Sequence, residues 1–202
     1  MTRAVALLRG INVGGRTANK AQLAGVLTSL GLTGVSTFIA SGNVLFDLDP
    51  GPTGKGPTGK GPTGKGPTGK DSLTEADRAD LEARIETGLQ AALGFAVVTF
   101  VRTAAEVSAA AGLDAFPGTD PAVSRHIGFL KTVPSAAVRD AVAALSTDRD
   151  MLSIHGRELW WLAHDGVGRS ALKPGALDKA AGQPVTARNV TTVRKLAALL
   201  GG

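Results

Sequence analysis

The order of apolar segments along this 202-residue chain constrains its fold most strongly. Short apolar runs typical of strands alternate with segments of helical spacing, and the order strand–helix–strand–strand–helix–strand occurs twice. The expected strands lie at 3–8, 35–39, 44–46 and 95–101, and then at 125–131, 150–155, 158–164 and 184–188. The expected helices lie at 19–30, 72–93, 135–145 and 171–181, with a bridging helix that opens on a capping box of Thr103 and Glu106 and a final helix at 190–200. This order is that of the ferredoxin-like arrangement.

The two halves also end alike, which indicates an internal duplication. In each half the last strand closes with an arginine, Arg102 or Arg188, and a residue suited to cap a helix follows. We therefore predict an α+β fold of two ferredoxin-like βαββαβ subdomains, formed by residues 1–102 and 103–202.

Residues 51–70 consist of the sequence Gly-Pro-Thr-Gly-Lys repeated four times. A phosphate-binding loop needs Ser or Thr after its Gly-Lys pair, whereas Gly or Asp follows each lysine here, and proline removes N–H donors. A segment this rich in Gly and Pro cannot bury a core. We expect a flexible, functionally silent expansion between a strand and a helix, where long surface insertions cost little.

The net charge of +5 belongs mainly to this repeat. Without its four lysines, 18 of the 22 basic residues remain against 17 acidic ones, a net charge of +1. Aromatic residues make up only 4% of the chain, so an RNA-binding sheet is also poorly supported. The sequence therefore argues against a nucleic-acid partner.

Composition excludes several kinds of site. The absence of cysteine excludes disulfides and thiolate metal centres, and His126, His155 and His164 are not at the spacing of metal ligands. We therefore predict no metal site. No apolar stretch approaches membrane-spanning length, and the first apolar run is too short for a secretory signal, so we expect a cytoplasmic protein without a membrane partner.

The predicted topology places the best candidate site in the first half. Because a right-handed crossover makes the first two strands parallel, the Gly-rich loop at 9–16 and the turn at 41–43 emerge at one end of the sheet. Loop N–H groups, a helix N-terminus and an arginine there would suit an anion. The candidate ligand-binding residues are Arg9, Asn12, Gly14, Gly15, Ser41 and Asn43. The alternative is that the glycines serve tight turns and that the asparagines bond to nearby backbone.

The same topology in the second half brings the 165–170 segment near the end of the last strand. The candidate residues there are Arg169, Ser170, Arg188 and Asn189. Asn189 would alternatively cap the final helix, and Arg188 would alternatively pair with a carboxylate or with loop carbonyls.

Four motifs carry a resemblance to a known family. With the sequences at 5–15, 38–44, 166–170 and 186–193, the chain resembles the family called domain of unknown function 1697. It departs from that family in the 51–70 repeat and at Val190, where an aromatic residue is expected. The resemblance implies an α+β fold of two ferredoxin-like subdomains and implies no activity.

Three functional hypotheses follow. The first is a protein that binds a small anionic or phosphorylated ligand at the Gly-rich loop. The second is an enzyme with acid–base or hydrolytic chemistry near Asp165 and Arg188, which would need carboxylates of perturbed pKa inside a cleft. The third is a protein–protein interaction module that uses the strand bearing Trp160 and Trp161 or an exposed sheet edge. The sequence identifies neither a cofactor nor an oligomeric state.

Overall fold

The computed structural model describes residues 2–39, 42–48 and 73–201. The predictions for the 51–70 repeat and for Ser41 lie outside these residues. The chain divides into two compact units, Met1–Val107 with Ala198–Gly202, and Ser108–Ala197. Each unit is described by itself below.

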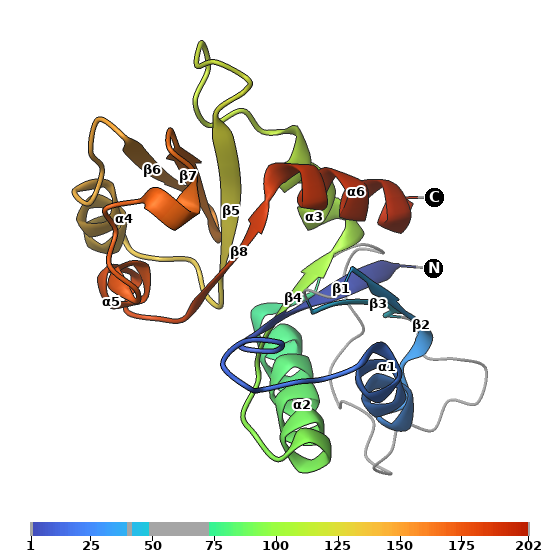
Figure 1. The fold of residues 1–202 in the computed structure, drawn as a ribbon. Coiled ribbons are helices and arrows are strands. Elements are labelled where there is room, and N and C mark those ends of the chain that lie inside the picture. The colour runs from blue at the N-terminus through green and yellow to red at the C-terminus, as the bar shows by residue number, and fades with distance from the viewer. Residues whose placement is uncertain (1, 40–41, 49–72, 202) are drawn as a thin grey trace. The chain divides into compact units, whose positions relative to one another are not determined.

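Unit 1 has the predicted βαββαβ order (Figure 1). Its elements are β1 (Arg3–Arg9), α1 (Lys20–Ser29), β2 (Thr33–Phe38), β3 (Asn43–Asp47), α2 (Glu75–Leu93) and β4 (Val98–Thr103), followed by α3 (Ala104–Gly112). The strands form one antiparallel sheet in the order β2-β3-β1-β4. In this order the first strand is central, as the ferredoxin-like arrangement requires.

Unit 2 repeats this topology. Its elements are β5 (Ser124–Leu130), α4 (Ala136–Ala143), β6 (Asp150–His155), β7 (Glu158–Ala163), the short 3-10 helix η1 (Val167–Arg169), α5 (Ala176–Ala181), β8 (Val185–Asn189) and α6 (Val190–Gly201). The antiparallel sheet has the order β6-β7-β5-β8, which corresponds strand by strand to that of unit 1. The predicted α+β fold of two ferredoxin-like subdomains is thus confirmed.

Several elements differ by a few residues from their expected bounds, and two of these differences have a clear backbone cause. The helix expected from residue 171 begins only at Ala176, because Pro174 disfavours helical geometry in the residue before it and Gly175 has a φ of +78°. The strand expected at 35–39 ends at Phe38, since Ile39 turns into the left-handed region.

The core of unit 1 lies between its sheet and the helices α1 and α2. Strand alternation turns Ala4, Ala6 and Leu8 of β1 toward the helices. They pack with Leu27 of α1 and Ile85 of α2, both fully buried. This packing holds α1 and α2 against one face of the sheet.

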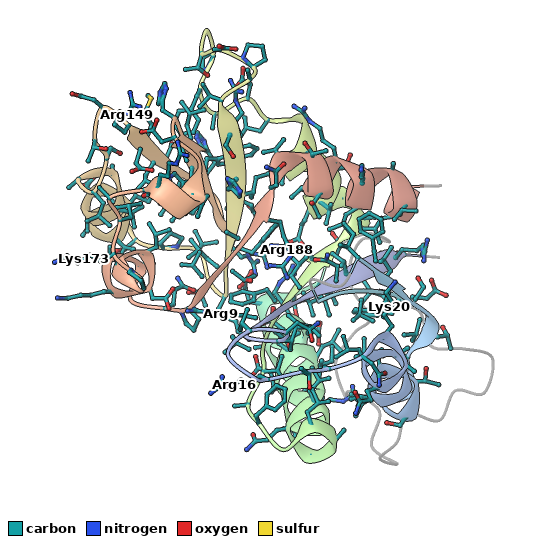
Figure 2. All side chains as sticks on the ribbon, in the orientation of Figure 1. Arg9, Arg16, Lys20, Arg149, Lys173 and Arg188 are labelled. Carbon is teal, nitrogen blue, oxygen red and sulfur yellow. The ribbon has the colours of Figure 1, made fainter. Side chains whose placement is uncertain are left out.

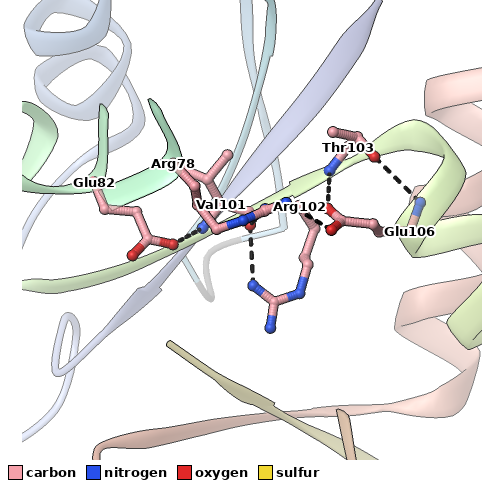
Figure 3. Close-up of polar contacts among 6 residues, drawn as sticks. All are labelled: Arg78, Glu82, Val101, Arg102, Thr103 and Glu106. Carbon is pink, nitrogen blue, oxygen red and sulfur yellow. Dashed lines mark hydrogen bonds and ion pairs between the residues drawn. The ribbon is translucent and has the colours of Figure 1, made fainter. Parts of the chain in front are cut away.

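Helix α2 also covers the open edge of β4 with charged side chains. Arg78, Glu82 and Glu86 follow one another at four-residue spacing along one face of the helix. Oε1 of Glu86 accepts from the N–H of Thr99 at 2.8 Å, and Oε1 of Glu82 accepts from the N–H of Val101 at 2.7 Å. Arg78 donates to the Val101 carbonyl (Figure 3). These side chains form hydrogen bonds with backbone groups of β4 that another strand could otherwise pair with.

The same arginine is neutralised within the unit. Arg78 is 2% exposed, and its Nη2 lies 2.6 Å from Oε1 of Glu106 in an ion pair. The other oxygen of Glu106 accepts from the N–H of Thr103 at 2.9 Å, and the Thr103 hydroxyl accepts from the N–H of Glu106 at 3.3 Å. The predicted capping box is confirmed, and it also holds the counterion of a buried cation.

We predict that Glu82→Ala lowers the free energy of unfolding by about 2 kcal/mol, because it leaves the buried N–H of Val101 without its acceptor. Glu82→Gln keeps a carbonyl acceptor and should lose clearly less. Urea denaturation measures both, with Asp80→Ala on the exposed side of α2 as the control. A loss for Glu82→Ala no larger than that of the control would contradict this role.

Candidate functional site

The loop between β1 and α1 folds back on itself. The N–H of Arg16 donates to the carbonyl of Val13 at 3.0 Å, and the N–H of Asn12 donates to the carbonyl of Arg16 at 2.6 Å. Gly14 and Gly15, at the centre of the turn, have φ values of +58° and +80°, the pattern of a type I′ turn. A Cβ on either glycine would have open space around it, so the turn itself requires them. For these two glycines, the structure fits the alternative given by the sequence analysis, in which they serve a tight turn.

Two asparagine side chains form hydrogen bonds where the loop leads into α1. Oδ1 of Asn12 accepts from the N–H of Ala18 at 3.1 Å, and the backbone of Asn12 is left-handed with a φ of +56°. Asn19 caps α1: its Oδ1 accepts from the N–H of Gln22 at 2.8 Å, and Oε1 of Gln22 accepts from the N–H of Asn19 at 3.0 Å. The path of the loop into α1 is therefore fixed at both of its asparagines.

The hairpin between β2 and β3 touches this loop, as the topology predicted. The N–H of Leu8 donates to the carbonyl of Gly42 at 2.7 Å. Gly42 has a φ of +73°, and a Cβ there would lie 2.7 Å from Cδ1 of Ile11. Only glycine therefore lets the hairpin and the loop approach this closely. Asn43, fully buried, donates through Nδ2 to the carbonyl of Phe38 at 3.1 Å and so closes the hairpin.

A pocket with a cavity volume of about 220 Å³ lies where the loop, the start of α1 and the hairpin meet. Its polar lining consists of Asn12, Asn19, Lys20, Thr37 and Asn43. Lys20, labelled in Figure 2, is the first residue of α1 and lines the pocket, at the end of the helix where the dipole is positive. The site therefore combines positive charge with amide and hydroxyl groups.

The apolar lining of the pocket consists of Ala18, Leu23 and Ile39. Ala18 and Leu23 belong to the buried core of unit 1, whereas Ile39 is 45% exposed. Ile39 has a φ of +59°, a left-handed conformation that is strained for a β-branched residue. Sequence analysis did not single out Lys20 or Ile39, although the position of Lys20 directly after a capping asparagine was a usable signal.

The loop's two arginines lie outside the pocket lining. Strand alternation places Arg9 on the face of the sheet that bears Val5 and Leu7, opposite the helices. The guanidinium of Arg16 lies 5.9 Å from the ring centroid of Phe95, a cation–π contact that holds the loop to the α2–β4 connection. Neither arginine supplies the pocket with its cation.

In unit 2, Ser170 belongs to a structural network around a buried carboxylate. Asp150 is 1% exposed and accepts from Oγ of Ser170 at 2.9 Å and from Nε1 of Trp161 at 2.8 Å. The Ser170 hydroxyl in turn accepts from the N–H of Leu172 at 3.0 Å. This arrangement ties the loop after β7 to the start of β6.

Asp165 and Arg169 lie on the exposed part of the same loop. Nε of Arg149 donates to Oδ2 of Asp165 at 2.7 Å, and a second guanidinium nitrogen binds the other carboxylate oxygen. The hydrogen bonds from Arg149 lower the pKa of Asp165, and the nearby charge of Arg169 lowers it further. Asp165 is thus an ionised partner in a surface ion pair.

The last strand of unit 2 carries the other two candidates. Arg188 is buried, and its Nη1 donates at 2.9 Å to the hydroxyl of Thr186 and to the carbonyl of Ala187. Burial lowers the pKa of Arg188 to about 10, so it remains charged at neutral pH. Oδ1 of Asn189 accepts from the N–H of Thr191 at 2.8 Å, which confirms the interpretation of Asn189 as a cap of the final helix.

The ends of β7 and β8 lie at the same end of the sheet, as the topology implies, but on opposite sides of β5. Ala163 is opposite Ser124, and Asn189 is opposite His126.

Among residues 2–39, 42–48 and 73–201, no group of three or more acidic or imidazole side chains could hold a metal ion. Within the same residues, no helix is long and apolar enough to cross a membrane.

Comparison with known proteins gives a family and a fold. The model of the family described as "Protein of unknown function (DUF1697)" matches residues 1–55 and 72–160, a span that includes the motifs at 5–15 and 38–44 and ends before those at 166–170 and 186–193. A solved structure, described as that of a conserved bacterial protein SP0830 from Streptococcus pneumoniae, is similar with a TM-score of 0.67 and 22% identity. The similarity covers 100% of this chain and 99% of that one. No curated protein matches significantly.

We predict that Gly42→Ala destabilises the protein by about 2 kcal/mol, because the new Cβ meets Ile11 and the residue must keep a positive φ. Gly15→Ala is the matched control, since it shares the positive φ but adds a Cβ in open space. Thermal unfolding compares the two. An equal loss for both variants would show that the close approach at Gly42 does not matter.

A second prediction concerns pH. Burial lowers the pKa of His126, whose buried Nδ1 has no hydrogen-bond partner within the described part of the chain and whose ring centroid lies 6.1 Å from that of Trp161. Between its folded pKa and about 6.5, the unfolded chain binds more protons, so this contribution to stability is present above pH 6.5 and is lost as pH falls.

His126→Phe should remove this part of the pH dependence. Denaturation of both proteins between neutral pH and about pH 5 measures it. The prediction fails if the wild-type protein and the variant lose stability in parallel over that range.

Proposed function

The chain belongs to this family of proteins of unknown function, and we propose that it binds a small anionic or phosphorylated ligand in the pocket of unit 1. The observation that carries the proposal is the lining of the pocket by Lys20 at the first turn of α1, together with three asparagine side chains. Helix N-termini and lysine both favour anions, and the asparagine side chains add polar groups to the lining.

The two units provide an internal comparison that supports this choice. Both join the end of their first strand to the following hairpin, through Leu8 and Gly42 at 2.7 Å in unit 1 and through Leu130 and Arg157 at 3.0 Å in unit 2. The loop before the first helix, however, spans residues 10–19 in unit 1 and only 131–135 in unit 2.

The longer loop of unit 1 supplies residues to the pocket. Asn12 and Ala18, both in this loop, belong to its lining, and the turn around Gly14 and Gly15 gives the loop its shape. Extra loop residues on a shared scaffold are a common location of binding function. The difference between the units therefore favours unit 1 as the location of the site.

The rival hypothesis of acid–base chemistry near Asp165 and Arg188 has less support. It requires a carboxylate of perturbed pKa inside a cleft. The pKa of Asp165 is lowered by its pairing with Arg149, and the pair lies on an exposed surface, so Asp165 remains ionised rather than poised to exchange a proton.

We predict that Lys20→Ala weakens the binding of inorganic phosphate or a short carboxylate about tenfold, because a hydrogen-bonded charge pair is lost. Isothermal titration calorimetry on the full chain measures the affinity. Lys173→Ala, which removes an exposed lysine of unit 2, should leave it unchanged. Equal losses in both variants, or no binding of either anion to the wild-type protein, would contradict the proposal.

A further inference from the structure

We propose that the ligand of this pocket is a short carboxylate with an apolar chain, and that Ile39 determines its specificity. This inference rests on the proposed function, since it concerns the same pocket. It adds the chemical class of the ligand and a residue that distinguishes one anion from another.

The pocket has two chemically different walls. Lys20 and the asparagines form the polar one, whereas Ala18, Leu23 and Ile39 form an apolar one. Ala18 and Leu23 are 6% and 4% exposed and continue into the core of unit 1. A bare inorganic anion would make no favourable contact with this apolar wall. An anion that carries an apolar group would use both walls.

Ile39 is the unusual member of the apolar wall. It is 45% exposed, so its side chain adds little to the core, and its φ of +59° would suit glycine or asparagine better than isoleucine. Backbone strain of this kind clusters at active sites, ligand clamps and switch regions. The position of Ile39 on the pocket wall fits the role of a ligand clamp.

The size of the cavity limits the ligand. The pocket has a volume of about 220 Å³. It lies below the roughly 300–1,000 Å³ of pockets that enclose drug-sized ligands. A nucleotide or a sugar diphosphate would extend well beyond a pocket of this volume, whereas a short-chain carboxylate, with its head group near Lys20 and its chain against Ile39, matches it.

The experiment is a series of straight-chain carboxylates from acetate to octanoate, titrated calorimetrically into the full chain. For the wild-type protein, affinity should rise about fourfold with each methylene until the cavity is filled, and then stop rising. Ile39→Asn keeps a residue that tolerates positive φ but removes the apolar wall. This variant should bind acetate within about twofold of the wild-type protein and should lose most of the rise with chain length.

Two controls separate specificity from folding. Ile39→Gly should melt no lower than the wild-type protein, because it relieves the strained backbone while also losing the rise with chain length. Val133→Asn alters an exposed apolar residue of unit 2 and should change neither property.

The outcomes distinguish the two proposals. If the wild-type protein binds no carboxylate and no phosphate, the proposed function itself fails. If acetate binds and Lys20→Ala weakens that binding about tenfold, but affinity does not rise with chain length, the proposed function stands and the role of Ile39 is overturned. A rise that persists in Ile39→Asn also overturns it.

Discussion

The hydrogen bond from the N–H of Leu8 to the carbonyl of Gly42, at 2.7 Å, is the constraint on which the candidate site depends. It joins the end of β1 to the following hairpin, and the missing Cβ of Gly42 leaves space for Ile11. The hairpin side of the pocket and the loop side are thereby held in contact. Unit 2 makes the corresponding bond between Leu130 and Arg157, although its loop before the first helix is shorter. The bond is therefore a feature of the shared fold, whereas the pocket depends on the longer loop of unit 1.

The scaffold around this contact is held by buried polar side chains as well as by apolar packing. Arg78 and Glu82 bind the backbone of β4 along the edge of the sheet that no other described strand pairs with, and Glu106 neutralises the buried arginine. Asp150 performs a comparable task in unit 2, where it fixes the loop after β7 through Ser170. These groups are hydrogen-bonded within their own units, and all except the partly exposed Glu106 are buried. They therefore serve the structure, and the pocket beside Lys20 is the better candidate for a ligand site.

Much of the fold followed from the sequence, because periodicity and the handedness of crossovers determine element order and which loops share one end of a sheet. The expected proximity of the Gly-rich loop and the hairpin was correct for this reason. The side chains that matter were harder to identify. The sequence already offered a tight turn as one reading of Gly14 and Gly15, whereas the positive φ of Ile39 and the pairing of Glu82 with β4 arise only in the folded unit. No local pattern reveals such tertiary relations.

The most direct test of the central claim, that the unit 1 pocket binds a small anion, is an amide-resolved NMR titration of the full chain with butyrate. The account predicts saturable shifts of the side-chain amides of Asn12, Asn19 and Asn43 and of the backbone amide of Lys20, with unit 2 unaffected. Saturable shifts confined to unit 2, or none at any of these amides, would contradict it.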